Sequence, residues 1–250
     1  AIGELALEAT VNAEIDTRVR QEALEYWYAA TLVPELNSTI EALLPRVVGG
    51  LLSCMVFSDD EVAKVDERDA QGLTDHDAKK LLADDDGDEK SDDDRTIRRA
   101  AAGVLDQLAE GFGSHVLTGS LPHIQDALSR PQNGASYNWR ETEAAVLALG
   151  AMTTGAASEL VPFCSQVVEK ISGFAADASQ PVLLRAISVW TLQRILVDVA
   201  VQDNAIEGVI SASVAAILAC MTQSESVHLT FAATTAMTTI IETSAGSETP

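Results

Sequence analysis

The sequence predicts an all-α fold, an α-solenoid in which about five antiparallel helix pairs stack into a superhelix. Three observations favour it. Aromatic residues make up only 4% of the 250 residues, and β-branched runs are scarce beside Ala, Leu, Glu and Gln. Helical segments recur at a nearly constant spacing. Short runs rich in Pro, Asn, Gly and Ser separate one helix pair from the next, as expected of turns.

The repeat is clearest in the second helix of each pair. Aligning these helices on their second residues places five residues at one position, and we call them the register residues: Arg20, Arg98, Thr142, Arg185 and His228. The last four are separated by 44, 43 and 43 residues. A period in the low forties is typical of two-helix HEAT-type or armadillo-type repeats. Each pair exposes an apolar face that only a neighbouring pair can cover, so the pairs must stack.

The first helices of four pairs are expected at 40–56, 114–129, 160–174 and 205–221. Turn residues agree with these limits: Pro131 and Gly134 interrupt one helical pattern, and Asp177 and Pro181 interrupt another. Residues 1–250 are therefore expected to form a single HEAT-repeat segment. The chain starts without Met and partway through a helical pattern, which predicts a fragment of a longer chain.

Residues 59–94 form an acidic tract that interrupts the repeat. Arg20 and Arg98 are 78 residues apart, one repeat plus an insertion. The tract holds 16 Asp or Glu against five Lys or Arg, which is half of the chain's net charge of −22. Such a run is hydrated and repels itself, which predicts a disordered loop within one repeat, between its first helix (40–56) and its second (97–111). Acidity that serves solubility alone is the simpler alternative.

Composition also limits the possible partners. A pI near 4.3 argues against direct nucleic-acid binding, which needs clustered Lys and Arg, and favours basic partners. No stretch of 18 uninterrupted apolar residues occurs, so no membrane insertion is expected. Cys54, Cys164 and Cys220 lie in apolar helical runs without CxxC spacing, which favours a reducing compartment.

No recognisable catalytic or metal-binding pattern occurs in the sequence. The run LADDDGDEKSDD puts Gly87 at the sixth position of a calcium loop, but Leu82 would then be the first ligand, and leucine cannot coordinate calcium. The four histidines lack HExxH or Cys/His spacing, and no GxSxG, Walker-type or GxGxxG pattern precedes a helix. We therefore expect a binding protein that is not an enzyme, with no catalytic residue, metal site or cofactor.

A candidate binding stripe lies on the helix that starts at Leu184. Ile187, Trp190 and Arg194 are spaced i, i+3 and i+7, so they share one face and offer an aromatic platform with a polar rim for an extended peptide. The alternative is that Trp190 packs in the core and Arg194 is an ordinary surface charge, and spacing alone slightly favours it. At the register of Trp190 one and two repeats earlier stand Leu147 and Gly103.

Four segments carry a resemblance to a known family: LRAISVWTLQRI; Trp139 with Glu143 and the following LALGA; IRRAAAGVLDQLA; and EYWYAA followed by LLPRVVGGLLSCMVFSDDE. Over nearly all its length the chain resembles the middle of a transportin, the karyopherin-β2 class of nuclear import receptor. The importin-β class shares the Trp-Thr-x-x-Arg helix and a shorter acidic loop, but not the SD-rich entry into that loop.

The resemblance implies a cargo site. In transportins the concave face of these repeats binds basic nuclear localisation signals that end in a Pro-Tyr pair. By helix register, the contact positions correspond to Gly103, Asp106, Leu147, Ile187, Trp190 and Arg194. Gly103 stands where the family usually has Ala. With the resemblance counted, we interpret Trp190 as facing the ligand. The loop at 131–137 is several residues longer than the family's, which leaves the geometry of the strip open.

The resemblance also implies regulation by the acidic loop. In the family the GTP form of the small GTPase Ran presses this loop toward the cargo site, so that loop and cargo exclude each other. The corresponding loop residues are Asp84, Asp85, Asp86, Asp88, Glu89, Asp92, Asp93 and Asp94. Nucleoporins are the further expected partners, and the protein is expected to shuttle between cytoplasm and nucleus. A rival hypothesis is a rigid scaffold such as the helical-repeat subunit of a phosphatase, but a 36-residue acidic insertion counts against it.

Overall fold

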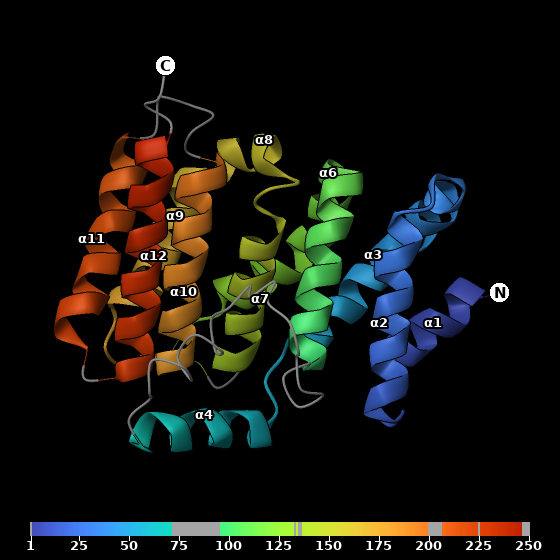
Figure 1. Ribbon diagram of the computed structural model, residues 1–250, viewed down its shortest axis with the longest axis horizontal. Coiled ribbons are helices and arrows are strands. Elements are labelled where there is room, and N and C mark those ends of the chain that lie inside the picture. Colours follow the sequence, from blue (N-terminus) through green and yellow to red (C-terminus); the bar gives the residue numbers. More distant parts are fainter. Residues whose placement is uncertain are drawn as a thin grey trace. The chain divides into compact units, whose positions relative to one another are not determined.

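The computed structural model describes residues 2–71, 96–132, 134, 137–199, 207–224 and 226–246, and within these ranges it contains helices and no strand (Figure 1). The helices are arranged as stacked pairs, so the predicted all-α solenoid is confirmed. The described helices fall into two compact units. One unit contains α1, α2, α3, α6 and α7, and the other contains α4 and α9 to α12.

In the first unit, α1 (Ile2–Val11) pairs with α2 (Thr17–Thr31). The short helix η1 (Pro34–Leu36) leads into α3 (Asn37–Cys54), which packs on α1 and on α6 (Ile97–Ser129). Helix α7 (Trp139–Met152) packs on α6. First helices thus contact first helices while each also contacts its own partner, which is the stacking that a repeat of helix pairs requires.

Helix α6 is broken at Gly113, where φ is +36° and ψ is −103°. Its two parts are the second helix of one pair and the first helix of the next, as predicted for 97–111 and 114–129. A residue with a Cβ is strained at this positive φ, and its Cβ would lie 3.3 Å from the carbonyl oxygen of Gly155. Gly113 therefore provides the turn between two consecutive repeats without any intervening loop.

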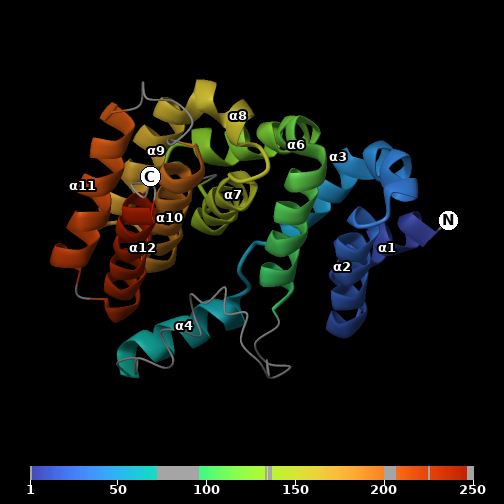
Figure 2. The ribbon, with the colours of Figure 1, turned by 45° about the horizontal axis from the view of Figure 1, so that its top comes forward.

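The first unit ends within the short helix α8 (Ala157–Leu160), and in the second unit η3 (Val161–Phe163) leads into α9 (Cys164–Ala176). Helix α10 (Val182–Arg194) continues into a π-helical turn, η4 (Ile195–Val199). The last pair is α11 (Glu207–Gln223) and α12 (Val227–Gly246). Figures 1 and 2 show these four long helices side by side, and the contacts run between α9 and α10, α11 and α12, α9 and α11, and α10 and α12.

Four of the five register residues share a structural role: Arg20, Arg98, Thr142 and Arg185. The guanidinium of Arg20 donates to the carbonyl oxygen of Thr10 at 3.4 Å, and Nε of Arg185 donates to that of Ala175 at 3.0 Å. Both acceptors lie in the last turn of the first helix of the same pair. Carbonyls at a helix end have no partner within the helix, and the negative end of the helix dipole favours a cation. Each arginine therefore holds the two helices of its pair together.

The other described contacts follow the same rule. Arg98 donates to the carbonyl of Met55, which caps the C-terminus of α3. The hydroxyl of Thr142 lies 3.4 Å from the carbonyl oxygen of Ala127 in the last turn of α6 and 3.3 Å from that of Asn138 at the start of its own helix, so it can donate to either. A hydroxyl is shorter than a guanidinium but supplies the same donor. What these residues have in common at this position is therefore a hydrogen-bond donor and not a positive charge.

Two cysteines donate to the same carbonyls from the neighbouring pair. Cys54 Sγ lies 3.2 Å from the carbonyl oxygen of Thr10, and Cys220 Sγ lies 3.2 Å from that of Ala175. Burial raises the pKa of both thiols, although Arg20 and Arg185 respectively oppose the shift. The thiols therefore stay protonated and act as donors. All three cysteines are free and buried.

The structure corrects one part of the prediction for the acidic tract. A disordered loop was expected from residue 59, but Asp59–Gln71 forms helix α4. A capping box starts it: the hydroxyl of Ser58 accepts from the Glu61 amide at 3.3 Å, and the Glu61 carboxylate accepts from the Ser58 amide at 2.9 Å. Asp59 and Asp60 add negative charge to the first turn, where the helix dipole favours it. The eight predicted regulatory acidic residues between 84 and 94 lie outside the described residues.

Within the described ranges, no single helix is both long and apolar enough to cross a membrane. One bent pair of helices, residues 34–54 with 59–67, reaches the length and apolar composition of a membrane span when the two helices are taken together. Much of α3 is buried in the first unit, including Val47, Val48 and Leu51. These side chains form protein core.

Candidate functional site

Helix α10 carries the predicted stripe. Between Leu183 and Leu192 every side chain is buried except those of Ile187 and Trp190, which are partly exposed. Trp190 thus differs from Trp27, which is 1% exposed in the core of the first unit. Arg194, one turn beyond Trp190, is also partly exposed. The structure brings Ile187, Trp190 and Arg194 together on one surface of α10.

Arg194 is held between two neighbours. Its Cζ lies 5.4 Å from the centroid of the Trp190 ring, a cation–π arrangement. Its Nε lies 3.5 Å from Oδ2 of Asp198, and the two side chains are 19% and 21% exposed. Sequence reasoning did not identify Asp198. The i, i+4 spacing from Arg194 to Asp198 was the available signal, because residues four apart on a helix are neighbours.

The predicted residues on α6 lie together on its first half. Gly103 is exposed, and a Cβ built on it would meet nothing within 4 Å. Alanine would therefore fit at this position. Asp106, three residues later and partly exposed, lies on the same side of the helix. This pair offers an open backbone surface beside a carboxylate.

Leu147 on α7 differs from the other five predicted residues, because it is only 8% exposed. All residues of α7 from Thr142 to Met152 are buried. The helix therefore offers a ligand little apolar surface at this position. Gly103, Asp106 and Leu147 belong to the first unit, whereas Ile187, Trp190 and Arg194 belong to the second.

A buried ion pair supports α7 one turn before Leu147. The guanidinium of Arg98 donates to both carboxylate oxygens of Glu143, one of them at 2.7 Å, and also to the carbonyl of Met55. The side chains of Arg98 and Glu143 are 11% and 1% exposed. Arg98 therefore joins the end of α3, the start of α6 and the first turns of α7. Met55 and Arg98 also flank the acidic tract in the sequence.

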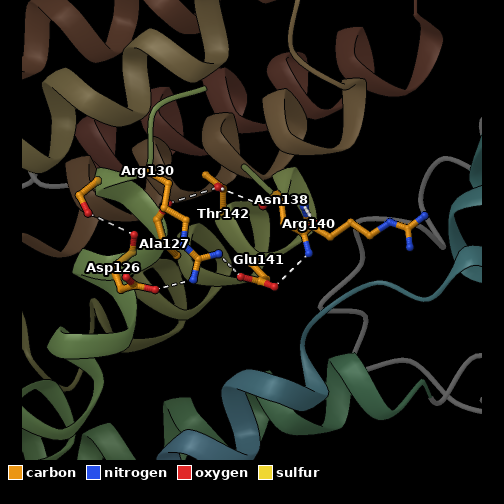
Figure 3. Close-up of polar contacts among 8 residues, drawn as sticks. Asp126, Ala127, Arg130, Asn138, Arg140, Glu141 and Thr142 are labelled. Carbon is orange, nitrogen blue, oxygen red and sulfur yellow. Dashed lines mark hydrogen bonds and ion pairs between the residues drawn. The ribbon is translucent and has the colours of Figure 1, made fainter. Parts of the chain in front are cut away.

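The connection from α6 to α7 is fixed by a second set of polar contacts (Figure 3). Arg130 pairs with Asp126 and Glu141, and their hydrogen bonds raise the pKa of the guanidinium further above its usual range. Asn138 caps α7 by accepting from the Arg140 amide at 3.1 Å, and its amide donates to Glu141 at 3.0 Å. Figure 3 shows the Arg140 side chain extending away from this cluster. These contacts hold Arg130 and Asn138, which flank the predicted longer loop at 131–137.

The part of the chain that the structure describes contains no group of three or more His, Cys, Asp or Glu side chains that could hold a metal ion. The arrangement supplies surfaces for binding: an aromatic ring with a stacked guanidinium on α10, and an open glycine with a carboxylate on α6.

No protein-family model matches the chain. Transportin-1 of Oryza sativa subsp. japonica is 33% identical over 191 residues, which cover 72% of this chain and 21% of that protein. Importin subunit beta-2 of Schizosaccharomyces pombe is 27% identical over 232 residues, which cover 78% of this chain and 24% of that protein. The chain thus spans about a fifth to a quarter of the length of these relatives.

Solved structures share the fold. Kap121p, in a crystal structure with RanGTP, superposes with a TM-score of 0.69 at 18% identity, over 96% of this chain and 21% of that one. The same protein bound to Nup53p gives a TM-score of 0.68 at 17% identity, over 97% of this chain and 21% of that one. At this identity the likeness concerns the fold, a HEAT-repeat solenoid.

Proposed function

This chain is homologous to transportins and importin-β-class karyopherins, and on that premise we propose that it acts in a nuclear transport receptor. The proposed ligand is a basic, extended nuclear localisation signal of a cargo protein that ends in a Pro-Tyr pair. Its receptor would shuttle between cytoplasm and nucleus. The proposed function is binding, with no catalytic step.

The observation that carries this proposal is the surface of α10. Trp190 is partly exposed in a helix whose neighbouring side chains are almost all buried, and Arg194 stacks over its ring. An exposed indole supplies apolar contact for a proline or tyrosine ring, and the guanidinium supplies donors for backbone carbonyls. Tryptophan and arginine are enriched among residues that dominate binding energies.

Gly103 and Asp106 are the proposed contacts on α6. The open space above Gly103 admits close approach of a peptide backbone, and the Asp106 carboxylate is complementary to a basic side chain. The net charge of −22 favours capture of basic peptides and makes it salt-dependent, since the Debye length is about 8 Å at physiological ionic strength. Leu147 on α7 is a further proposed contact, although its exposure of 8% leaves little of the side chain for a ligand.

Binding can be tested by fluorescence polarisation of the full chain with a labelled basic peptide that ends in Pro-Tyr. The same peptide with Ala-Ala at its end is the ligand control. Trp190→Ala should weaken binding by about 2 kcal/mol or more and leave helicity unchanged. Ile210→Ala is the matched variant, because Ile210 is a 45% exposed apolar residue on α11 of the same unit.

Equal binding of both peptides would contradict Pro-Tyr recognition. Absence of binding by either peptide would favour the scaffold hypothesis. A large loss of helicity in Trp190→Ala would instead assign Trp190 to the core.

We further propose that Ran in its GTP form and nucleoporins are partners, and that the acidic tract couples Ran binding to cargo release. Two sites that exclude each other are linked reciprocally, so cargo must weaken Ran binding by the same factor. Deleting residues 72–95 while keeping α4 tests the coupling. If Ran-GTP displaces the peptide equally well from the deletion variant, the tract is not the coupler.

A further inference from the structure

We propose that Asp198 is a positioning residue that fixes the Arg194 guanidinium over the Trp190 ring and so prepares the α10 surface for its ligand. The inference rests on the proposed function, because it concerns the same surface. It adds a residue that neither the helix register nor the family resemblance indicates. Asp198 is placed here by its distance of 3.5 Å from Nε of Arg194 and by their shared partial burial.

Residues Ile187, Trp190, Arg194 and Asp198 are partly exposed and follow one another at i, i+3, i+7 and i+11, so they form one stripe. Arg194 occupies the space between an aromatic face and a carboxylate, each one turn away. Asp198 lies in the π-helical turn η4, which directly follows α10.

A free arginine side chain samples many rotamers, and ordering it on binding opposes association. A guanidinium that already lies against Trp190 and Asp198 has lost much of that freedom before the ligand arrives. Removing the carboxylate takes away one of the contacts that hold the guanidinium, which therefore becomes more mobile over the ring. The ligand must then order it.

The proposed ligand is basic, and an isolated arginine at the centre of its site would repel it. The Asp198 carboxylate neutralises Arg194 locally, so the indole and guanidinium planes can receive the peptide without a net positive charge beneath it. Repulsion between exposed charges is screened by salt, so this part of the effect should fade as ionic strength rises. The greater mobility of Arg194 and its uncompensated charge both predict weaker binding when Asp198 is neutralised.

The test compares Asp198→Asn, Asp198→Glu and the wild-type full chain in the peptide assay at low and physiological salt. Asp198→Asn should weaken binding on the order of threefold, the range expected for a partly exposed ion pair, with a larger loss at low salt. Asp198→Glu should restore affinity, because it keeps the carboxylate. Asp126→Asn is the matched control, since Asp126 makes an i, i+4 pair with Arg130 in the other unit.

A spectroscopic measurement separates positioning from a purely structural role. The indole N–H resonance of Trp190, assigned by its loss in Trp190→Phe, should shift in Asp198→Asn and return toward its wild-type position in Asp198→Glu. In an Arg194→Ala background, Asp198→Asn should have no further effect on affinity, because the two residues act as one unit.

The outcomes are distinguishable from failure of the proposed function. If the wild-type chain does not bind the Pro-Tyr peptide, the proposed function itself is wrong. If it binds and Asp198→Asn binds equally well or more tightly, Asp198 does not position Arg194 for the ligand, and tighter binding would mean that it competes with the ligand for Arg194. An equal loss in the Arg194→Ala background would also overturn the proposal.

Discussion

Neutralising Glu143 should destabilise the first unit far more than neutralising a carboxylate two residues earlier on the same helix. Glu143 is 1% exposed and binds Arg98, which is 11% exposed, so Glu143→Gln leaves a largely buried guanidinium without its counter-charge. Removing one partner of a buried pair costs about 3–5 kcal/mol. Arg98 keeps its bond to the Met55 carbonyl, and the new amide oxygen still accepts one hydrogen bond. We therefore expect a loss at the lower end, about 3 kcal/mol.

For a chain of this size, each kcal/mol lowers Tm by about 2–4 °C, so thermal unfolding followed by circular dichroism should shift by roughly 6–12 °C. Glu141→Gln is the control, because Glu141 pairs with Arg130 at 40% exposure and should contribute less than about 1 kcal/mol. Urea denaturation of both variants gives the two free energies of unfolding. If Glu143→Gln and Glu141→Gln lower the free energy of unfolding equally, burial does not decide the strength of these two ion pairs.

Three further predictions concern other residues. Gly113→Ala should destabilise the first unit by about 1 kcal/mol or more in urea denaturation, because alanine is strained at φ +36°, whereas Gly103→Ala should be neutral or stabilising. Ser58→Ala removes the capping box and should lower protection of the α4 amides from hydrogen exchange by about 1 kcal/mol; unchanged protection would show that the cap is not needed. Burial raises the pKa of the Cys54 and Cys220 thiols in the folded protein. Their contribution to stability is therefore complete below the unfolded thiol pKa of about 8.5 and is lost as the pH rises through the folded pKa values. The urea midpoints at pH 7 and pH 9.5 should accordingly differ less in the double alanine variant than in the wild type.

Helix identity was predictable from the sequence, because the apolar pattern repeats with the period of a helix pair. The break at Gly113 was predictable for the same reason, since a helix of one pair and a helix of the next met there without polar turn residues. Boundaries moved by a few residues. The helix expected at 160–174 is Cys164–Ala176, because Pro162 and its neighbours form a short 3₁₀ turn before it.

What the sequence did not predict depends on local hydrogen bonding within polar segments. Charge density in the acidic tract indicated disorder, yet residues 59–71 form α4, whose start is capped by reciprocal hydrogen bonds between Ser58 and Glu61. The S-x-x-E spacing was the available signal. The repeat register alone also could not predict the partial exposure of Trp190 or the burial of Leu147. Spacing assigns residues to one face of a helix, but neighbouring helices decide how much of that face is covered.

The carbonyl oxygens of Thr10 and Ala175 each accept two hydrogen bonds, which has a consequence for how the chain unfolds. Each accepts one bond from its own helix pair and another from the next pair. In a repeat protein the intrinsic stability of a repeat and its coupling to a neighbour are usually separate quantities. Here both quantities depend on the same carbonyl oxygen. If the end of one first helix frays, the arginine contact within its own pair and the thiol contact from the next pair are lost together. We therefore expect local opening at one repeat to weaken the contact to the adjacent repeat, which favours a cooperative unit of unfolding larger than one helix pair.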